Sequence, residues 1–174
     1  GGIRETRLLN DGQPRQAVPF ATAVRSVFAP GRRSTMCLLL SIFAWFIGYQ
    51  GVEAFFTLYA VNVLGVDAAA GAFTLGCFAL ASLLFSTPAG FLAVRFGRRR
   101  TIRTGLATLI LVFLAGYTAR SVAVLQGLFL LGGLGWAMIN VNSYPMVVEM
   151  AGSSEIGTYT GLYYFFSSGA AIAG

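Results

Sequence analysis

Glu53 is the residue whose chemistry stands out, because it is the only acidic side chain deep inside an apolar run. An ionisable group in such a place normally faces a cavity or a partner, since lipid cannot solvate its charge. Tyr49 and Gln50 lie on the neighbouring helical turn. This polar and aromatic face could bind solute hydroxyl groups, or Glu53 could carry a proton on a carboxyl group whose pKa burial raises. The alternative is a structural glutamate near a membrane surface.

A second group of side chains repeats at a spacing of four, which places them on one helix face: Trp136, Asn140 and Tyr144. Asparagine offers both donors and acceptors, and aromatic rings stack on the apolar faces of sugars. This pattern predicts substrate-binding residues. The alternatives are hydrogen bonds between helices for Asn140 and Asn142, and packing or interfacial anchoring for the two aromatic residues.

A third group is basic and lies between two long apolar runs, in the segment GFLAVRFGRRRTI at positions 90–102. It contains Arg95, Arg98, Arg99 and Arg100, and Arg103 follows directly. An ionised side chain at mid-depth in a bilayer costs roughly 2.5–3.5 kcal/mol on insertion scales. The segment therefore predicts a short loop, 95–103, at a membrane edge, and short basic loops remain cytoplasmic.

Composition supports a membrane protein. The 174 residues are 56% hydrophobic and 10% charged, whereas soluble domains carry about 25% charged residues. The net charge of +6 could suggest nucleic acid, but the arginines cluster before the first apolar run and in the 95–103 segment. Topology, and then contact with membrane lipid, explain this placement better, so no nucleic-acid partner is expected. With no histidine and two separated cysteines, we expect no metal site, no cofactor and no enzyme activity.

Five apolar runs predict an all-α integral membrane bundle with about five transmembrane helices. They cover residues 36–65, 68–94, 105–119, 121–150 and 157 onward. Glycines and polar residues at 48–53 are expected to interrupt the first run, and Gly132–Gly135 with Pro145 to break the fourth. Alternation then places residues 1–34, a basic linker, on the cytoplasmic side with the 95–103 loop. The chain lacks an initial Met and ends in an apolar run, which suggests a piece of a longer protein.

The basic segment resembles the signature loop of the major facilitator superfamily, G-x-L-x-D-R-x-G-R-R, which joins the second and third helices of each six-helix half. The matching residues are Gly90, Leu92, Arg95, Gly97, Arg98 and Arg99. Val94 stands where the family usually has Asp, a departure commoner in the second copy of the loop. The resemblance therefore implies the carboxy-terminal half of a twelve-helix transporter, with residues 35–174 as its transmembrane part and the amino-terminal half as its partner.

The stretch GWAMINVNSYPMVVEMAGSSEIGTYTGLYYFFSS is similar to the tenth-to-eleventh helix region of bacterial sugar:cation symporters, the sucrose-transporter-like and glycoside–cation branch. This resemblance implies alternating-access transport of a small solute, a sugar or glycoside with proton coupling, across a bacterial inner membrane. The alternatives are an exporter of drug-like or other solutes and a transporter-like solute sensor that does not translocate.

The family pattern also implies a role for Glu149, at the end of the fourth run. In the family, an acid at this position pairs with arginines of the signature loop and holds the inward face shut. We therefore predict a conformational latch between Glu149 and Arg95 or Arg98, with Gly90, Gly97 and Arg99 in the same loop. The alternative is a solvated glutamate beside lipid headgroups.

Overall fold

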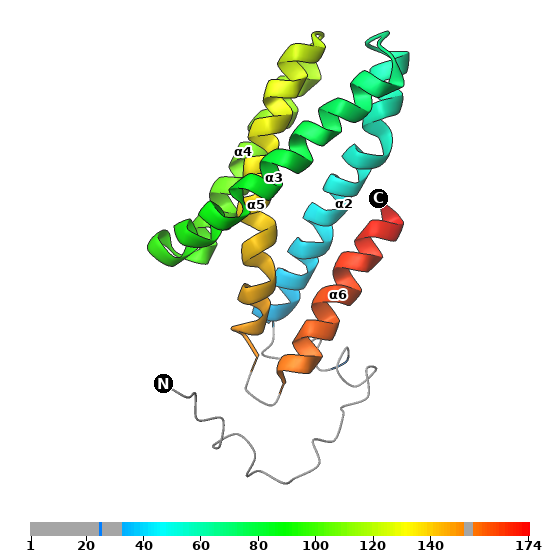
Figure 1. Ribbon diagram of the computed structural model, residues 1–174. Helices are drawn as coiled ribbons and strands as arrows, with labels where there is room; N and C mark the ends of the chain where they lie inside the picture. Colours follow the sequence, from blue (N-terminus) through cyan, green and yellow to red (C-terminus); the bar gives the residue numbers. More distant parts are fainter. Residues whose placement is uncertain (1–24, 26–32, 152–154) are drawn as a thin grey trace, which may run out of the picture.

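The computed structural model describes residue 25, residues 33–151 and residues 155–174. Five long helices follow one another in this part of the chain, namely α2 (Arg33–Asn62), α3 (Ala68–Phe96), α4 (Arg98–Thr118), α5 (Val122–Val148) and α6 (Ile156–Ala173) (Figure 1). The prediction of an all-α bundle is therefore confirmed. The predicted linker, residues 1–34, lies almost entirely outside the described residues.

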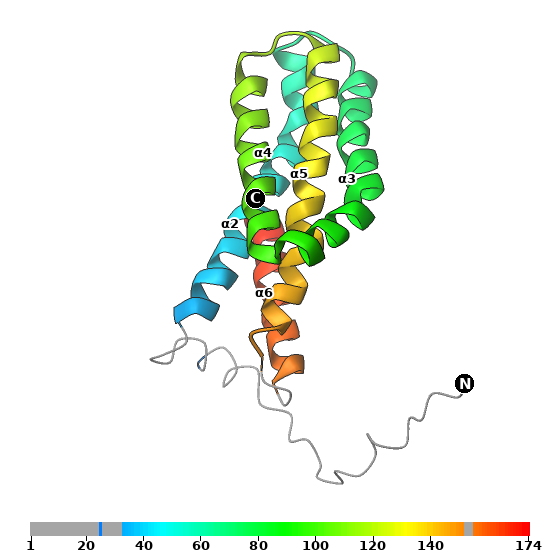
Figure 2. The same cartoon turned by 90° about the vertical axis from the view of Figure 1, so that its left-hand side faces the viewer.

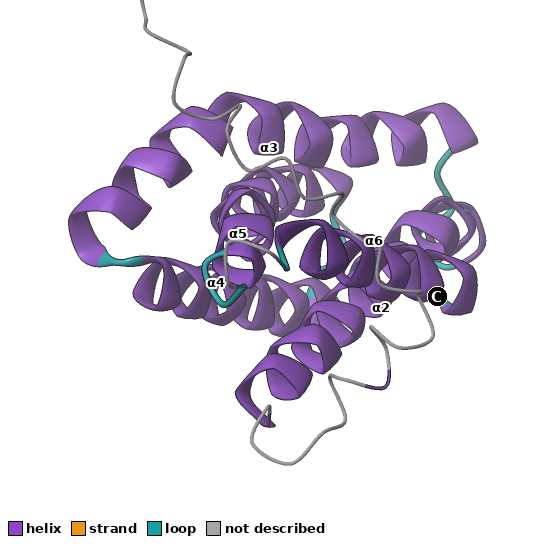
Figure 3. Ribbon diagram, turned by 90° about the horizontal axis from the view of Figure 1, so that it is seen from below, coloured by secondary structure: helices purple, strands orange, loops and turns teal. Residues whose placement is uncertain are grey.

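Helix α5 lies among the other four helices and contacts each of them (Figures 2 and 3). Its most extensive contacts are with α3 and α4, while α2 and α6 pair along the other side. Consecutive helices run in opposite directions (Figure 1). The start of α2, the junction of α3 and α4, and the end of α5 therefore lie toward the same end of the bundle. This is the end at which the sequence places its basic clusters.

Close packing of backbones holds α5 against its neighbours. A Cβ atom on Gly133 would collide with the carbonyl oxygen of Phe78 in α3, and one on Gly105 in α4 would lie 2.5 Å from the carbonyl oxygen of Gly135. Glycine is required at these points because small residues alone let helix backbones approach so closely. The predicted break at Gly132–Gly135 is wrong, since α5 continues through these glycines and through Pro145.

Two other sequence expectations about helix continuity are also wrong. Helix α2 continues without interruption through residues 48–53, because single glycines lower helix propensity without removing a backbone hydrogen bond. The predicted loop at 95–103 shrinks to Gly97, whose φ of 88° ends α3 and starts α4. A residue with a Cβ atom rarely adopts that conformation. The arginines tolerate helical positions because their long side chains can extend from the membrane edge to water.

Four helices within the described residues, α2 to α5, are long and apolar enough to cross a membrane. The fifth, α6, has 18 residues and includes Tyr, Thr and Ser side chains that lower its hydropathy, so it falls outside that group. Large apolar side chains such as Leu83, Phe91 and Leu114 are exposed on the outside of α3 and α4. Such a surface is stable in lipid and unstable in water.

Substituting Ala for Gly133 should destabilise the bundle, because the new methyl group meets backbone atoms of α3 that cannot rotate away. Overpacking of this kind costs roughly 1–3 kcal/mol. The control is Gly127→Ala, on the same helix, where nothing lies within 4 Å of the added Cβ. Thermal unfolding of the detergent-purified protein should show a lower transition temperature for Gly133→Ala alone. Equal transitions for the two variants would contradict the proposed backbone packing.

Candidate solute-binding site

A cavity of about 200 Å³ lies between α2, α3, α4 and α5. Its walls are mainly aromatic and aliphatic, and they include Trp45, Tyr49, Glu53, Phe78, Phe113 and Trp136. Its lining, apolar with a few polar groups, is typical of a small-molecule site, while its volume is below the roughly 300–1,000 Å³ of most such sites. Three of the six predicted substrate-binding residues, Tyr49, Glu53 and Trp136, thus line one cavity although the first and last lie on different helices.

The rings of Tyr49 and Trp136 form one face of the cavity. Their centroids are 4.4 Å apart and the planes differ by 11°, so the rings are stacked. Phe46 meets Trp136 edge-on at 5.2 Å, and Phe78 lies 5.7 Å from Tyr49. Because Trp136 is only 5% exposed, its ring is fixed from several sides. The result is a rigid aromatic wall whose shape is set before any solute binds.

Glu53 provides the carboxylate of this cavity. It follows Tyr49 by one turn of α2, and both residues line the cavity. In the helical part of the chain that the structure describes, no cluster of three or more His, Cys, Asp or Glu side chains could hold a metal ion. A carboxylate in this position can accept hydrogen bonds from a solute, or it can take up a proton.

The other three predicted substrate-binding residues lie outside this cavity. Gln50 packs beside Gly174 at the end of α6, and Asn140 is exposed on α5. The Tyr144 hydroxyl is 3.2 Å from the Thr160 hydroxyl of α6. The stripe formed by Trp136, Asn140 and Tyr144 thus does not line a single site. Helices α2 and α6 contact α5 at different points along its length. Successive residues of one stripe on α5 therefore contact different helices.

Polar contacts between helices involve residues to which the sequence analysis gave no functional role. The Asn142 amide donates to the carbonyl oxygens of Met138, at 2.9 Å, and Ala89 in α3, at 3.4 Å, so the structural alternative holds for this asparagine. Ser143 and Tyr163 place their hydroxyl oxygens 3.3 Å apart, linking α5 to α6. A serine and a tyrosine far apart in sequence carry no pattern that could have revealed this pair.

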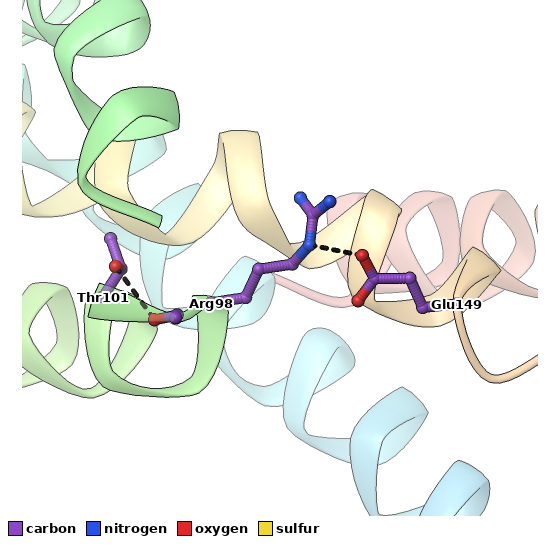
Figure 4. Close-up of polar contacts among 4 residues, drawn as sticks. Arg98, Thr101 and Glu149 are labelled. Atoms are coloured by element: carbon purple, nitrogen blue, oxygen red, sulfur yellow. Dashed lines mark hydrogen bonds and ion pairs between the residues drawn. The ribbon is translucent and has the colours of Figure 1, made fainter. Parts of the chain in front are cut away.

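At the end of the bundle, the structure brings Glu149 and Arg98 together (Figure 4). The Arg98 Nε atom donates to Glu149 Oε1 at 2.8 Å. Arg95 instead lies over the ring of Phe96, 5.4 Å from its centroid. Gly90 lies next to Val141 of α5, and Gly97 forms the junction between α3 and α4. The contact is present, while its role as a latch is still a prediction.

A bundle of apolar helices with alternating directions, exposed apolar faces and an aromatic cavity defines a multi-pass membrane protein. A family model for the Major Facilitator Superfamily matches residues 4–174, and the chain belongs to that family. The family consists of membrane transporters and not of enzymes. No curated protein and no solved structure matches the chain significantly, so the match supports the family and no particular branch of it.

Removing the ion pair should change the balance between conformations without unfolding the protein. The Arg98 and Glu149 side chains are 35% and 59% exposed, and such pairs contribute on the order of 0.2–1 kcal/mol. The probe is a cysteine introduced by Asn140→Cys, and maleimide is added on the side of the membrane where the ion pair lies. We expect Glu149→Gln and Arg98→Gln each to raise the labelling rate of this cysteine by up to about fivefold. Both native cysteines would first be replaced by Ser.

The control for this experiment is Arg100→Gln, which removes a neighbouring charge from the same helix. The double variant Arg98→Gln/Glu149→Gln should label no faster than either single variant, because both remove the same contact. Labelling that is unchanged by Glu149→Gln, or equally raised by Arg100→Gln, would contradict the latch.

Proposed function

We propose that the protein is a proton-coupled secondary transporter for a small organic solute, and that the solute contacts the cavity wall formed by Tyr49, Trp136 and Glu53. One observation carries the proposal: a carboxylate within an apolar span lies beside a fixed aromatic stack in the same cavity. In a transporter of this family, two halves rock around a site near the middle of the membrane. The amino-terminal half would supply the remaining contacts, and residues 1–34 and 95–103 would face the cytoplasm of a bacterial inner membrane.

Glu53 is the proposed proton carrier. A carboxyl group that faces one side of the membrane in one conformation and the other side in the next can carry a proton between them. Such a change couples loading and release of the proton to the movement of the halves. Glu53 lines the same cavity as Tyr49 and Trp136, so the carboxylate lies beside the wall that would contact the solute.

A sugar or glycoside is the first substrate class proposed, because aromatic rings stack on the apolar faces of sugar rings. The second class is a lipophilic organic cation, and the lining of the cavity favours it. The predicted partners for sugar hydroxyls, Gln50, Asn140 and Tyr144, lie outside the cavity, whereas aromatic rings and one carboxylate remain. Aromatic faces attract cations, and Glu53 would pair with the charge.

Uptake by the intact protein in proteoliposomes would test coupling and substrate class together. For a sugar carrier, we expect an inward proton gradient to drive uptake of labelled sucrose or maltose. For a cation carrier, we expect protons to enter in exchange for labelled tetraphenylphosphonium, which leaves the vesicle. Glu53→Gln should abolish the response to the gradient, because Gln cannot take up a proton. The control is Asp67→Asn, at the N-terminus of α3, where Asn preserves the helix cap.

If a solute shows no transport at any proton gradient, its substrate class is excluded. Gradient-driven flux that survives Glu53→Gln would contradict the role of this residue. Solute binding without any flux in the wild-type protein would support the alternative of a solute sensor.

Binding can be measured separately from transport, because the two tryptophans of this chain, Trp45 and Trp136, both line the cavity. Titration with sucrose, maltose or tetraphenylphosphonium should change tryptophan fluorescence when the solute binds there. The fluorescence change that is lost in the Trp136→Phe variant of the intact protein measures solute binding at the wall formed by Tyr49 and Trp136. Phe keeps an aromatic ring and so the packing with Phe46 and Tyr49. A binding signal that is identical in wild type and Trp136→Phe would place the solute elsewhere.

A further inference from the structure

A second pocket, separate from the aromatic cavity, lies at the end of the bundle where α3 meets α4. Its volume is about 520 Å³. Four arginines line it, Arg98, Arg99, Arg100 and Arg103, together with a single acidic residue, Glu149. Positive charge therefore exceeds negative charge within the pocket, which makes an anion its natural ligand.

The known contact of Arg98 leaves most of this charge available. Arg98 uses Nε for Glu149 (Figure 4), and within the described residues its terminal nitrogens donate no hydrogen bond. Arg99 and Arg100 are exposed, and Arg103 bends back so that its Nε donates to the Arg99 carbonyl oxygen at 3.4 Å. An anion could thus bind the guanidinium nitrogens that contact no described residue while the Arg98–Glu149 pair stays intact.

The backbone adds to the positive potential. Helix α4 begins at this pocket with no capping side chain at Gly97 and no acidic residue in its first turn. Helix α3 differs, because the carboxylate of Asp67 accepts a hydrogen bond from the Ala70 amide at 2.8 Å. The start of α4 therefore keeps the partial positive charge of a helix N-terminus next to the arginine side chains.

The remaining lining is apolar and comes from Phe96, Met146 and Met150. Phe96 is 52% exposed at the end of α3, whose outer face carries the apolar side chains expected to contact lipid. A ligand with a phosphate group and an attached hydrocarbon chain fits both parts of the lining, whereas free phosphate would use only the arginines. We propose that this pocket binds the headgroup phosphate of an anionic phospholipid, with the chains running along Phe96.

Native mass spectrometry of the intact, detergent-purified protein would test this proposal with phosphatidylglycerol and phosphatidylcholine of the same acyl chains. We expect wild type to retain phosphatidylglycerol several-fold more than phosphatidylcholine. The double variant Arg99→Gln/Arg100→Gln should lose that preference, because it removes two exposed charges from the pocket. The control is Arg120→Gln, which removes one arginine from the turn at the opposite end of α4 and should keep the preference.

Equal retention of the two lipids by wild type would overturn the proposal, and so would an unchanged preference in the double variant. Displacement of phosphatidylglycerol by millimolar inorganic phosphate would reassign the pocket to free phosphate and overturn the lipid source. Thermal unfolding shows whether each variant is folded. If the double variant is not, Arg100→Gln alone should still reduce the preference, and no reduction would count against the pocket.

Discussion

The close approach of α5 to α3 and α4 is the constraint on which the rest of the structure depends. In lipid the hydrophobic effect gives no drive for helices to associate, so packing must supply it. Gly133 and Gly105 supply it by removing the side chains that would separate the backbones. Trp136 follows Gly133 by three residues and therefore lies on the same side of α5, where its ring stacks on Tyr49 of α2. The glycines that bring α3 close to α5 thus lie beside the aromatic wall.

The same constraint explains why the cavity is formed where it is. Helices α2 and α4 both contact neighbours of α5, yet they make no close backbone contact with each other in the described residues. Aromatic side chains from α2, α3 and α5 fill part of the space between them, and Tyr49 stacked on Trp136 limits how far they can close it. Glu53 lies at the edge of this space. Its side chain is exposed, so the carboxylate is not buried among apolar groups.

Much of the fold follows from the sequence because lipid imposes a simple rule on it. Every backbone group inside the membrane must be paired within the helix, so long apolar runs become helices and charges mark their ends. The runs at 68–94 and 121–150 accordingly match α3 and α5 to within two residues at each end. Gly132–Gly135 and Gly97 show where the rule is insufficient. Glycine can break a helix or allow a close contact, and which of these occurs depends on a neighbour that the sequence does not identify.

The candidate site was predictable only in part, for a related reason. Spacing of four places Trp136, Asn140 and Tyr144 on one stripe, but the crossing of α2 and α6 determines what each meets. Glu53 was identifiable by itself because a carboxylate in an apolar run is costly wherever its neighbours lie. The arginines show the same contrast. Their number predicts a position at a membrane edge, but only the geometry shows that, within the described residues, Arg98 contacts Glu149 through Nε and through no other nitrogen. This unequal use of the arginines is the basis of both proposals for the cluster, the Arg98–Glu149 pair as a latch and the neighbouring arginines as an anion site.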